Sequence, residues 1–143
     1  MNKLIKYFLI IFVLLTFKSI AEENFFQEAK ELFDNGKMEE SKFLFQRNIV
    51  FNPKDSKSYL YLAKIFKKEE NEFEEEKNIN ATLLLESDNE EAMYMLIDIK
   101  LEKSDIKKVE DLKEKFKIIC DTLCSKIDSI DERLSNINVE NES

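Results

Sequence analysis

Apolar residues recur at intervals of three and four positions through residues 22–138, which is the spacing of amphipathic helices. The only strong helix breakers in this stretch are the pairs Asn35-Gly36 and Asn52-Pro53. The pattern therefore predicts a protein built from helices alone. The first five predicted helices cover about residues 22–35, 38–51, 56–69, 72–86 and 90–103.

The helical pattern repeats with a period of 34 residues. Superposing residues 22–55, 56–89 and 90–123 aligns Phe25 with Tyr59 and Met93, Ala29 with Ala63 and Ile97, and Phe51 with Leu85 and Ile119. The match is weaker in the third unit, where Lys100 takes the place of Leu32 and Phe66. Because one helix pair cannot bury both of its apolar stripes, about three such pairs must stack on one another.

The stretch EAKELFDNGKMEESKFLFQRNIVFNP, residues 28–53, resembles a tetratricopeptide repeat (TPR). It has the small Ala29 in its first helix, Gly36 at the turn between the helices and Asn52-Pro53 at its end. The resemblance extends over about residues 22–103 and weakens along the chain. It implies an all-α solenoid of antiparallel helix pairs, with an inner groove that binds a peptide or a protein segment.

The resemblance also implies which residues line that groove, because the family uses fixed positions of the first helix of each pair. Carried over to this chain, the peptide groove comprises Phe26, Lys30, Phe33, Lys57, Leu60, Lys64, Lys67, Lys68, Tyr94 and Asp98. The lysines suit an acidic segment, but they depart from the lysine, asparagine and arginine clamp of the chaperone-binding members. Alternatively, Asp34, Glu91, Asp98 and Glu102 neutralise the lysines across the groove.

The C-terminal part contains no Gly or Pro after Ser104. Apolar residues fall at Val109, Leu112, Phe116, Ile119 and Leu123 and then, after one further step of four, at Ile127, Ile130, Leu134 and Ile137. This spacing predicts one long amphipathic helix over about 105–138, within a C-terminal unit of residues 104–138, and a disordered tail over 139–143. The second half of the stripe either forms a homo-oligomer or docks a partner, or it folds back on the repeats.

Cys120 and Cys124 lie within this predicted helix, four positions apart. In a secreted chain two cysteines suggest a disulfide, yet residues four apart in a straight helix are at the edge of the permitted geometry. Three alternatives stay open: a bond within the chain that distorts the helix, two reduced thiols packed in an apolar face, or a bond between two chains.

Residues 1–21 have the pattern of a secretory signal peptide. Two lysines precede an uncharged run over 7–17, which as a helix would span about 16 Å of a ~30 Å hydrocarbon core. The small residues Ser19 and Ala21 follow, so we expect cleavage between Ala21 and Glu22, no stable membrane insertion afterwards, and a periplasmic or secreted protein. The alternative is an uncleaved N-terminal anchor.

Composition narrows the classes of function. The 143 residues include no His, one Gly, one Pro and two Cys. These counts exclude histidine-assisted nucleophiles, glycine-rich phosphate loops and four-ligand zinc sites. We therefore expect a protein that is not an enzyme and that needs neither cofactor nor metal.

Charge argues against nucleic acid as a partner. The formal net charge is −8, and removal of residues 1–21 takes away three lysines and no acid, which makes it −11. Such a chain is repelled by phosphate backbones. The sequence thus predicts an adaptor that binds a protein or peptide; the alternatives are a thiol-redox helper that uses Cys120 and Cys124, and a structural coiled-coil subunit.

Overall fold

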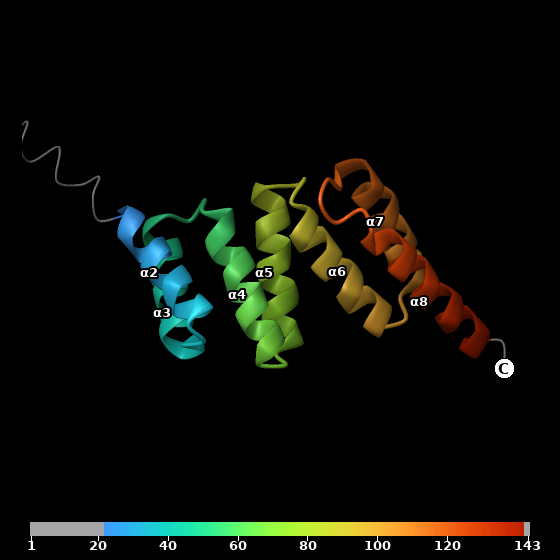
Figure 1. The fold of residues 1–143 in the computed structure, drawn as a ribbon, viewed down its shortest axis with the longest axis horizontal. Coiled ribbons are helices and arrows are strands. Elements are labelled where there is room, and N and C mark those ends of the chain that lie inside the picture. Colours follow the sequence, from blue (N-terminus) through green and yellow to red (C-terminus); the bar gives the residue numbers. More distant parts are fainter. Residues whose placement is uncertain (1–21, 142–143) are drawn as a thin grey trace, which may run out of the picture.

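The computed structural model describes residues 22–141, which form seven helices and, within that range, no strand (Figure 1). They are α2 (Glu22–Asp34), α3 (Met38–Phe51), α4 (Ser56–Lys68), α5 (Glu72–Leu85), α6 (Glu90–Glu102), α7 (Ile106–Ile119) and α8 (Lys126–Asn141). The helices follow one another along the long axis, from α2 at one end to α8 at the other. The all-α prediction is confirmed. The predicted signal peptide, residues 1–21, lies outside the described residues.

The 34-residue period is carried by the helix boundaries themselves. Helices α2, α4 and α6 begin at residues 22, 56 and 90, and helices α3, α5 and α7 begin at residues 38, 72 and 106. The third pair keeps this spacing although its sequence match is weak. The three units therefore agree more closely in the number of residues between turns than in the identity of their side chains.

The turn inside each helix pair has the same backbone conformation in all three units. Gly36, Glu70 and Ser104, each 34 residues apart, have φ angles of 77°, 55° and 53°. The next residue in each unit donates its backbone N–H, at 2.9 Å, to the carbonyl oxygen five positions earlier: Lys37 to Leu32, Asn71 to Phe66 and Asp105 to Lys100. This left-handed closure ends the first helix and turns the chain back along it.

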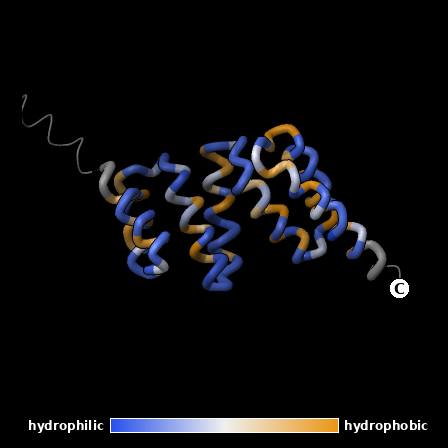
Figure 2. Tube along the Cα trace, in the orientation of Figure 1, coloured by the Kyte–Doolittle hydropathy of each residue, from blue (hydrophilic) through white to orange (hydrophobic). Residues whose placement is uncertain are grey.

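Two hydrophobic clusters hold the helices together (Figure 2). The first joins α2, α3 and α4 through fully buried residues such as Ala29 and Phe45. The second joins α4 to α8 and includes Ile97 and Phe116. Helix α4 contributes to both clusters, with Leu62 in the first and Ala63 in the second, and so it links them. Full burial of each large side chain is worth roughly 1.5–3 kcal/mol.

The prediction of one helix over 105–138 is wrong. Helix α7 ends at Ile119 and α8 begins at Lys126. In the loop between them Cys120 and Cys124 form a disulfide, with their Cα atoms 5.2 Å apart. Of the three alternatives for these cysteines, the structure thus has the bond within the chain, and the helix is interrupted where the bond forms.

Glu90, the first residue of α6, holds the same loop in place. Its carboxylate accepts hydrogen bonds from the backbone N–H groups of Asp121 at 2.8 Å, and of Thr122 and Leu123 at 3.1 Å, and from the Thr122 hydroxyl. In a continuous helix these N–H groups would point to the preceding turn. These bonds lower the pKa of Glu90 to about 2, the Thr122 hydroxyl contributing most.

Helix α8 folds back against the repeats. Ile130 and Leu134 are buried in the second cluster, and Lys113 of α7 pairs with Asp131 of α8 at 2.5 Å. The stripe that suggested homo-oligomerisation is therefore covered by this chain itself, and the oligomeric state stays a prediction. Because α8 extends to Asn141, residues 139–141 of the predicted tail are helical. Between residues 22 and 141, no helix is both long enough and apolar enough to cross a membrane.

Candidate peptide-binding surface

Side chains of α2, α4, α6 and α8 meet on one side of the helix array, which we call the inner surface. Lys64 of α4 pairs with Glu91 of α6 at 2.8 Å. Asp98 of α6 pairs with Lys67 of α4 at 2.5 Å and also with Arg133 of α8. The first helices of successive units and α8 thus lie side by side, as the predicted peptide groove requires.

Three half-buried aromatic rings form the apolar part of the inner surface at its α2 end. The Tyr61 ring centre lies 5.8 Å from that of Phe26 and 5.1 Å from that of Phe33, and both contacts are edge-on. Behind them the buried Phe45 stacks on Tyr61 at 5.0 Å. Aromatic pairs of this kind contribute roughly 0.5–1.5 kcal/mol beyond their buried area. They hold the rings in fixed positions while part of each stays accessible.

Two lysines of α4 lie over these rings. The Lys68 ammonium is 4.7 Å from the Phe33 ring centre, and the Lys64 ammonium is 4.8 Å from that of Tyr61. Lys68 is exposed, and among the described residues it has no carboxylate partner. A strip of aromatic surface with ammonium groups at its margin suits a segment that carries both apolar side chains and carboxylates.

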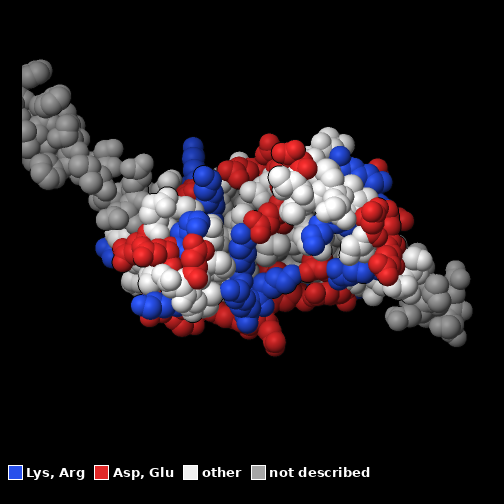
Figure 3. Space-filling view, viewed as in Figure 1, with Lys and Arg blue, Asp and Glu red and all other residues white. Residues whose placement is uncertain are grey.

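Asp98 is the electrostatic centre of the inner surface. Burial by itself would raise the pKa of Asp98, but hydrogen bonds from Arg133 and Lys67 outweigh burial and lower it. Likewise, burial would lower the pKa of Lys67, and its hydrogen bond to Asp98 raises it instead. Lys64 and Lys67 are thus neutralised by acids of α6. Both signs of charge are interspersed over the face in Figure 3.

The remaining predicted groove residues of α2 and α4 have different environments. Lys30 pairs with Asp34 of the same helix at 2.6 Å, and this hydrogen bond raises the pKa of Lys30. Lys57 is exposed, so its ammonium is available to a ligand. Leu60, in contrast, is buried in the second hydrophobic cluster and presents almost no surface.

Tyr94 lies farther along the inner surface, on α6. Its ring is 6.2 Å from the buried Phe116, and the Lys126 ammonium of α8 is 5.6 Å from its centre. The arrangement repeats, with fewer rings, the contact between Phe33 and Lys68. Helix α8 therefore extends the inner surface beyond the three repeats.

Tyr61 and Arg133 belong to the inner surface but are absent from the residues that the sequence predicts there. Tyr61 is the sixth residue of α4, a position that the family pattern does not assign to the groove, and the equivalent residues are Gln27 and Met95. Its aromatic ring among aliphatic neighbours was the available signal. Arg133 could not be placed because it reaches Asp98 only when α8 folds back.

Neither the cysteines nor the acids form a reactive centre on this surface. Cys120 and Cys124 are bonded to each other in the α7–α8 loop. In the part of the chain that the structure describes, no group of three or more Cys, Asp or Glu side chains is placed to hold a metal ion.

No family model and no curated protein matches the sequence. Its structure, however, is similar to solved structures. SycD from Yersinia enterocolitica, in complex with a peptide of the translocator YopD, has a TM-score of 0.68 at 14% identity, over 83% of this chain and 93% of that one. PcrH, in complex with the chaperone-binding region of PopD, has a TM-score of 0.67 at 11% identity, over 83% of this chain and 92% of that one.

The second TPR domain of human RPAP3, in complex with an HSP70 peptide, has a TM-score of 0.64 at 17% identity, over 86% of this chain and 97% of that one. This chain has a TPR-like fold. The TPR-like fold confirms the resemblance stated for about residues 22–103, and the structure adds α7 as the second helix of the third pair. At such low identities the similarity concerns the fold, and each bound peptide is a property of the protein that binds it.

Proposed function

We propose that this TPR-like protein is a non-enzymatic adaptor or chaperone that binds a segment of another protein on its inner surface. The observation that carries the proposal is the half-buried cluster of Phe26, Phe33 and Tyr61, with Lys68 at its margin. Solved TPR-like structures of SycD, PcrH and RPAP3, each with a bound peptide or binding region, support it.

The inner surface also indicates which kind of segment it binds. Lys64 and Lys67 are held by Glu91 and Asp98, so they offer little net positive charge to a ligand. Lys68 remains available beside the rings. The segment therefore packs apolar or aromatic side chains on the accessible parts of Phe26, Phe33 and Tyr61, with one carboxylate close to Lys68, rather than following a row of lysines.

Peptide selection tests this proposal directly. Peptides that bind the full-length protein are selected from a random phage-displayed library, synthesised with a fluorescent label and titrated by fluorescence polarisation. We expect enrichment of apolar residues next to Asp or Glu. Lys68→Glu should weaken binding by about tenfold, because it places a like charge beside the ligand's carboxylate. Lys107→Glu, an exposed change on α7, is the matched control and should leave binding unchanged.

Two results would contradict the inner surface as the binding site. The first is a selection that enriches no peptide, which would argue against peptide binding as such. If Lys68→Glu and Lys107→Glu weaken binding equally, the loss reflects overall charge rather than a local contact. Circular dichroism of both variants shows whether the helices are retained.

We also propose that the protein acts in the periplasm or outside the cell. The proposal rests on the signal-peptide pattern of residues 1–21 and is supported by the disulfide between Cys120 and Cys124, since disulfides persist in oxidising compartments. Intact-mass measurement on protein from the periplasmic fraction of a Gram-negative host should give a chain that begins at Glu22. A mass that includes residues 1–21, on protein extracted from membranes, would overturn it.

Neither alternative function gains an observation in its favour. The thiol-redox alternative needs an accessible, activated cysteine, whereas Cys120 and Cys124 are bonded and their loop is fastened to Glu90. The coiled-coil alternative needs one long helix, and the structure has two helices of 14 and 16 residues. We therefore propose a structural role for the disulfide, in fixing the α7–α8 loop.

A further inference from the structure

A second concave surface lies between α5 and α7, with α6 at its base. Its volume is about 640 Å³, and we call it the outer cleft. Its lining consists of Glu76, Asn80, Leu83 and Ser87 of the α5 region, Met93, Leu96 and Lys100 of α6, and Lys108, Leu112 and Lys115 of α7. None of these residues belongs to the inner surface.

The outer cleft and the inner surface are on opposite sides of α6. Successive residues of a helix are rotated by about 100°. On that geometry Met93, Leu96 and Lys100 point about half a turn away from Tyr94 and Asp98, which belong to the inner surface. A ligand on one surface therefore leaves the other free.

The floor of the outer cleft is apolar. It is formed by Met93 and Leu96 of α6 and Leu112 of α7, which are buried, and by the half-buried Leu83 of α5. The cleft continues along α5 into a second hollow of about 440 Å³ that shares Glu76 and Asn80 and includes the exposed Phe73. The concave surface is thus elongated, which fits a helix better than a compact small molecule.

One position in the second helix of each pair has an exposed aliphatic side chain, outside the lining of the outer cleft. Leu84 of α5 is 86% exposed and Ile118 of α7 is 83% exposed. They are 34 residues apart and so occupy the same position in successive units, and the equivalent Val50 of α3 is 76% exposed. Single exposed aliphatic side chains are common on protein surfaces, so these three do not by themselves define a docking surface.

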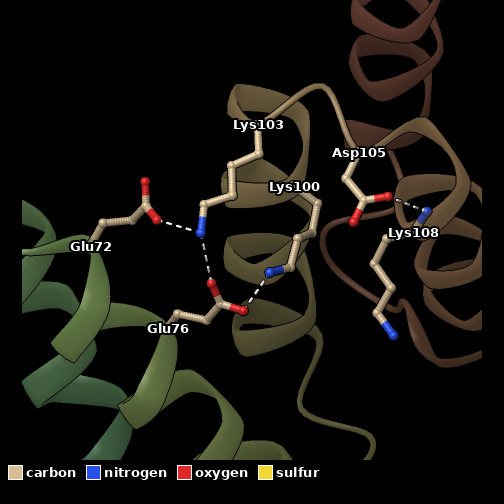
Figure 4. A network of polar contacts seen from close by, with 6 residues as sticks. All are labelled: Glu72, Glu76, Lys100, Lys103, Asp105 and Lys108. Atoms are coloured by element: carbon tan, nitrogen blue, oxygen red, sulfur yellow. Dashed lines mark hydrogen bonds and ion pairs between the residues drawn. The ribbon is translucent and has the colours of Figure 1, made fainter.

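Lysines give the rim of the outer cleft a positive charge. Glu76 is its one acidic residue and is engaged by Lys100 and, at 3.2 Å, by Lys103, as Figure 4 shows. The hydrogen bond from Lys100 contributes most to lowering the pKa of Glu76, so this acid stays ionised and paired. Two lysines then remain for a ligand, in a chain whose overall charge is negative.

Those two lysines are Lys108 and Lys115 of α7. Neither forms an ion pair with a side chain of residues 25–137, whereas Lys113 and Lys117 of the same helix do. The Lys108 backbone N–H donates to Asp105, but its side chain extends away from that carboxylate in Figure 4. Residues 108, 112 and 115 share one face of α7, so the two ammonium groups lie about two helical turns, or roughly 10 Å, apart along its axis.

We propose that the outer cleft is a second docking site, which binds an acidic amphipathic helix of a partner protein. The apolar stripe of that helix packs on the half-buried Leu83 and lies over the floor formed by Met93, Leu96 and Leu112, in the manner of a helix laid in a groove. Two carboxylates, about seven residues apart on its flank, pair with Lys108 and Lys115. The protein would then hold two segments at once, one on each side of α6. This goes beyond the proposed function.

The test uses synthetic peptides and the full-length protein. The probe is a fluorescein-labelled helical peptide of about 15 residues, with leucines spaced three and four apart and glutamates seven apart on one flank. Its control is a scrambled peptide of the same composition. Binding is measured by fluorescence polarisation, with nitrogen–proton NMR spectra to locate shifted resonances. We expect the probe to bind, the scrambled peptide to bind at least tenfold more weakly, and the shifts to fall on α5, α6 and α7.

Charge-reversal variants locate the contact. Lys108→Glu with Lys115→Glu should weaken binding of the probe by at least tenfold, because two attractive pairs become repulsive. The exposed neighbour Lys107→Glu and the inner-surface variant Lys68→Glu should leave it unchanged. Since Lys68→Glu tests the inner surface and the double variant tests the outer cleft, failure of one site is distinguishable from failure of the other.

Several outcomes would overturn the outer cleft as a helix-docking site. They are no detectable binding of the probe, equal binding of the scrambled peptide, an equal loss in Lys68→Glu, and NMR shifts confined to α2 and α4. A further arm uses vesicles of phosphatidylglycerol. Binding to these vesicles that is lost in the double variant, without binding of the peptide, would assign the lysines to an anionic lipid surface instead.

Discussion

The second residue after the first helix of each pair has a left-handed backbone in all three units, but only the first unit has glycine there. In the second and third units the residues are Glu70 and Ser104, with φ angles of 55° and 53°. A side chain in this conformation costs roughly 1–2 kcal/mol, because its Cβ approaches the following carbonyl oxygen. The repeat architecture therefore imposes a conformation that two of its sequences disfavour.

Replacing Glu70 with glycine should stabilise the protein. Glycine relieves the left-handed strain of the folded state but raises the chain entropy of the unfolded state. Because the first contribution is larger, the free energy of unfolding should rise by about 0.5–1 kcal/mol, or a few degrees in Tm. Glu70→Ala is the matched control, since it removes the charge but keeps the Cβ. Thermal unfolding followed by circular dichroism measures both; an equal gain in the two variants would attribute the effect to charge.

Glu75 is a second residue at odds with its position. It is 6% exposed, and one of its carboxylate oxygens has no hydrogen-bond partner among the described residues. The equivalent residues of the other units are Ser41, whose hydroxyl donates to the Ala29 carbonyl at 2.8 Å, and the buried Val109. Burial raises the pKa of Glu75, although the nearby Lys67 opposes this.

Glu75→Val should raise the stability at pH 7 by about 1–3 kcal/mol, because it removes an unsatisfied buried acceptor. The gain should shrink as the pH falls. A carboxyl whose folded-state pKa is raised binds a proton more readily when folded, so the wild-type protein recovers stability as the pH falls through that pKa. Urea unfolding at pH 7 and pH 5 measures this. A gain in stability that is independent of pH would mean that the ionised Glu75 carboxylate is not the source of the destabilisation.

At the scale of side chains, the sequence predicted which residues lie near the inner surface better than which of them are free to contact a ligand. The family pattern assigned Lys64 and Lys67 to the groove, and in the structure both reach from α4 to α6. The alternative that Glu91 and Asp98 neutralise these lysines was also open in the sequence, and the structure has both ion pairs. The sequence did not decide between the two, because an ion pair depends on side-chain reach across two helices. Leu60 was predicted in the groove and is buried instead, since α4 packs against both clusters.

At the scale of helices, the first five were predictable to within one residue at each boundary, because breakers and apolar spacing agree. The break between α7 and α8 was not predictable from periodicity. Apolar residues continue at helical spacing through Ile119, Leu123 and Ile127, which predicts an uninterrupted helix. The disulfide and the Glu90 carboxylate, a residue about thirty positions away, override that pattern.

Glu90 should make the α7–α8 loop sensitive to acid. Its pKa is lowered to about 2, below the usual value of 4.5. A lowered folded-state pKa contributes stability that is complete above the unfolded-state pKa and is lost as the pH falls from about 4.5 through 2. Tm measured between pH 6 and pH 2 should therefore fall less steeply in Glu90→Gln, which cannot titrate, than in the wild-type protein.

The Glu90→Gln comparison has an internal control. Glu91 lies next to Glu90 and makes one ion pair, with Lys64 of α4, but does not contact the loop. Glu91→Gln should therefore retain the wild-type drop in Tm between pH 4.5 and 2. If both variants behave like the wild-type protein, the loop is held by the disulfide and not by Glu90.

At the scale of the whole molecule, α8 completes a solenoid that three helix pairs would leave open. Helix α6 would otherwise expose Tyr94 and the residues around Ile97 at the end of the array. In the fold observed, Ile130 and Leu134 cover that side, and Arg133 joins Asp98. The same stripe was open to two interpretations in the sequence, because a helix pattern shows that a face is apolar but not what covers it.

The decisive variant is therefore Ile130→Asp. Ile130 is 1% exposed within the second hydrophobic cluster, so the change removes a packed side chain and places an unpaired charge there. Loss of the side chain alone costs about 2–5 kcal/mol, which should lower Tm by ten degrees or more. Ser129→Asp, on the exposed side of the same helix, should leave Tm unchanged and is the matched control. Sedimentation velocity of all three proteins should give a monomer. A wild-type dimer that Ile130→Asp dissociates without lowering the Tm would instead show that a second copy covers the stripe.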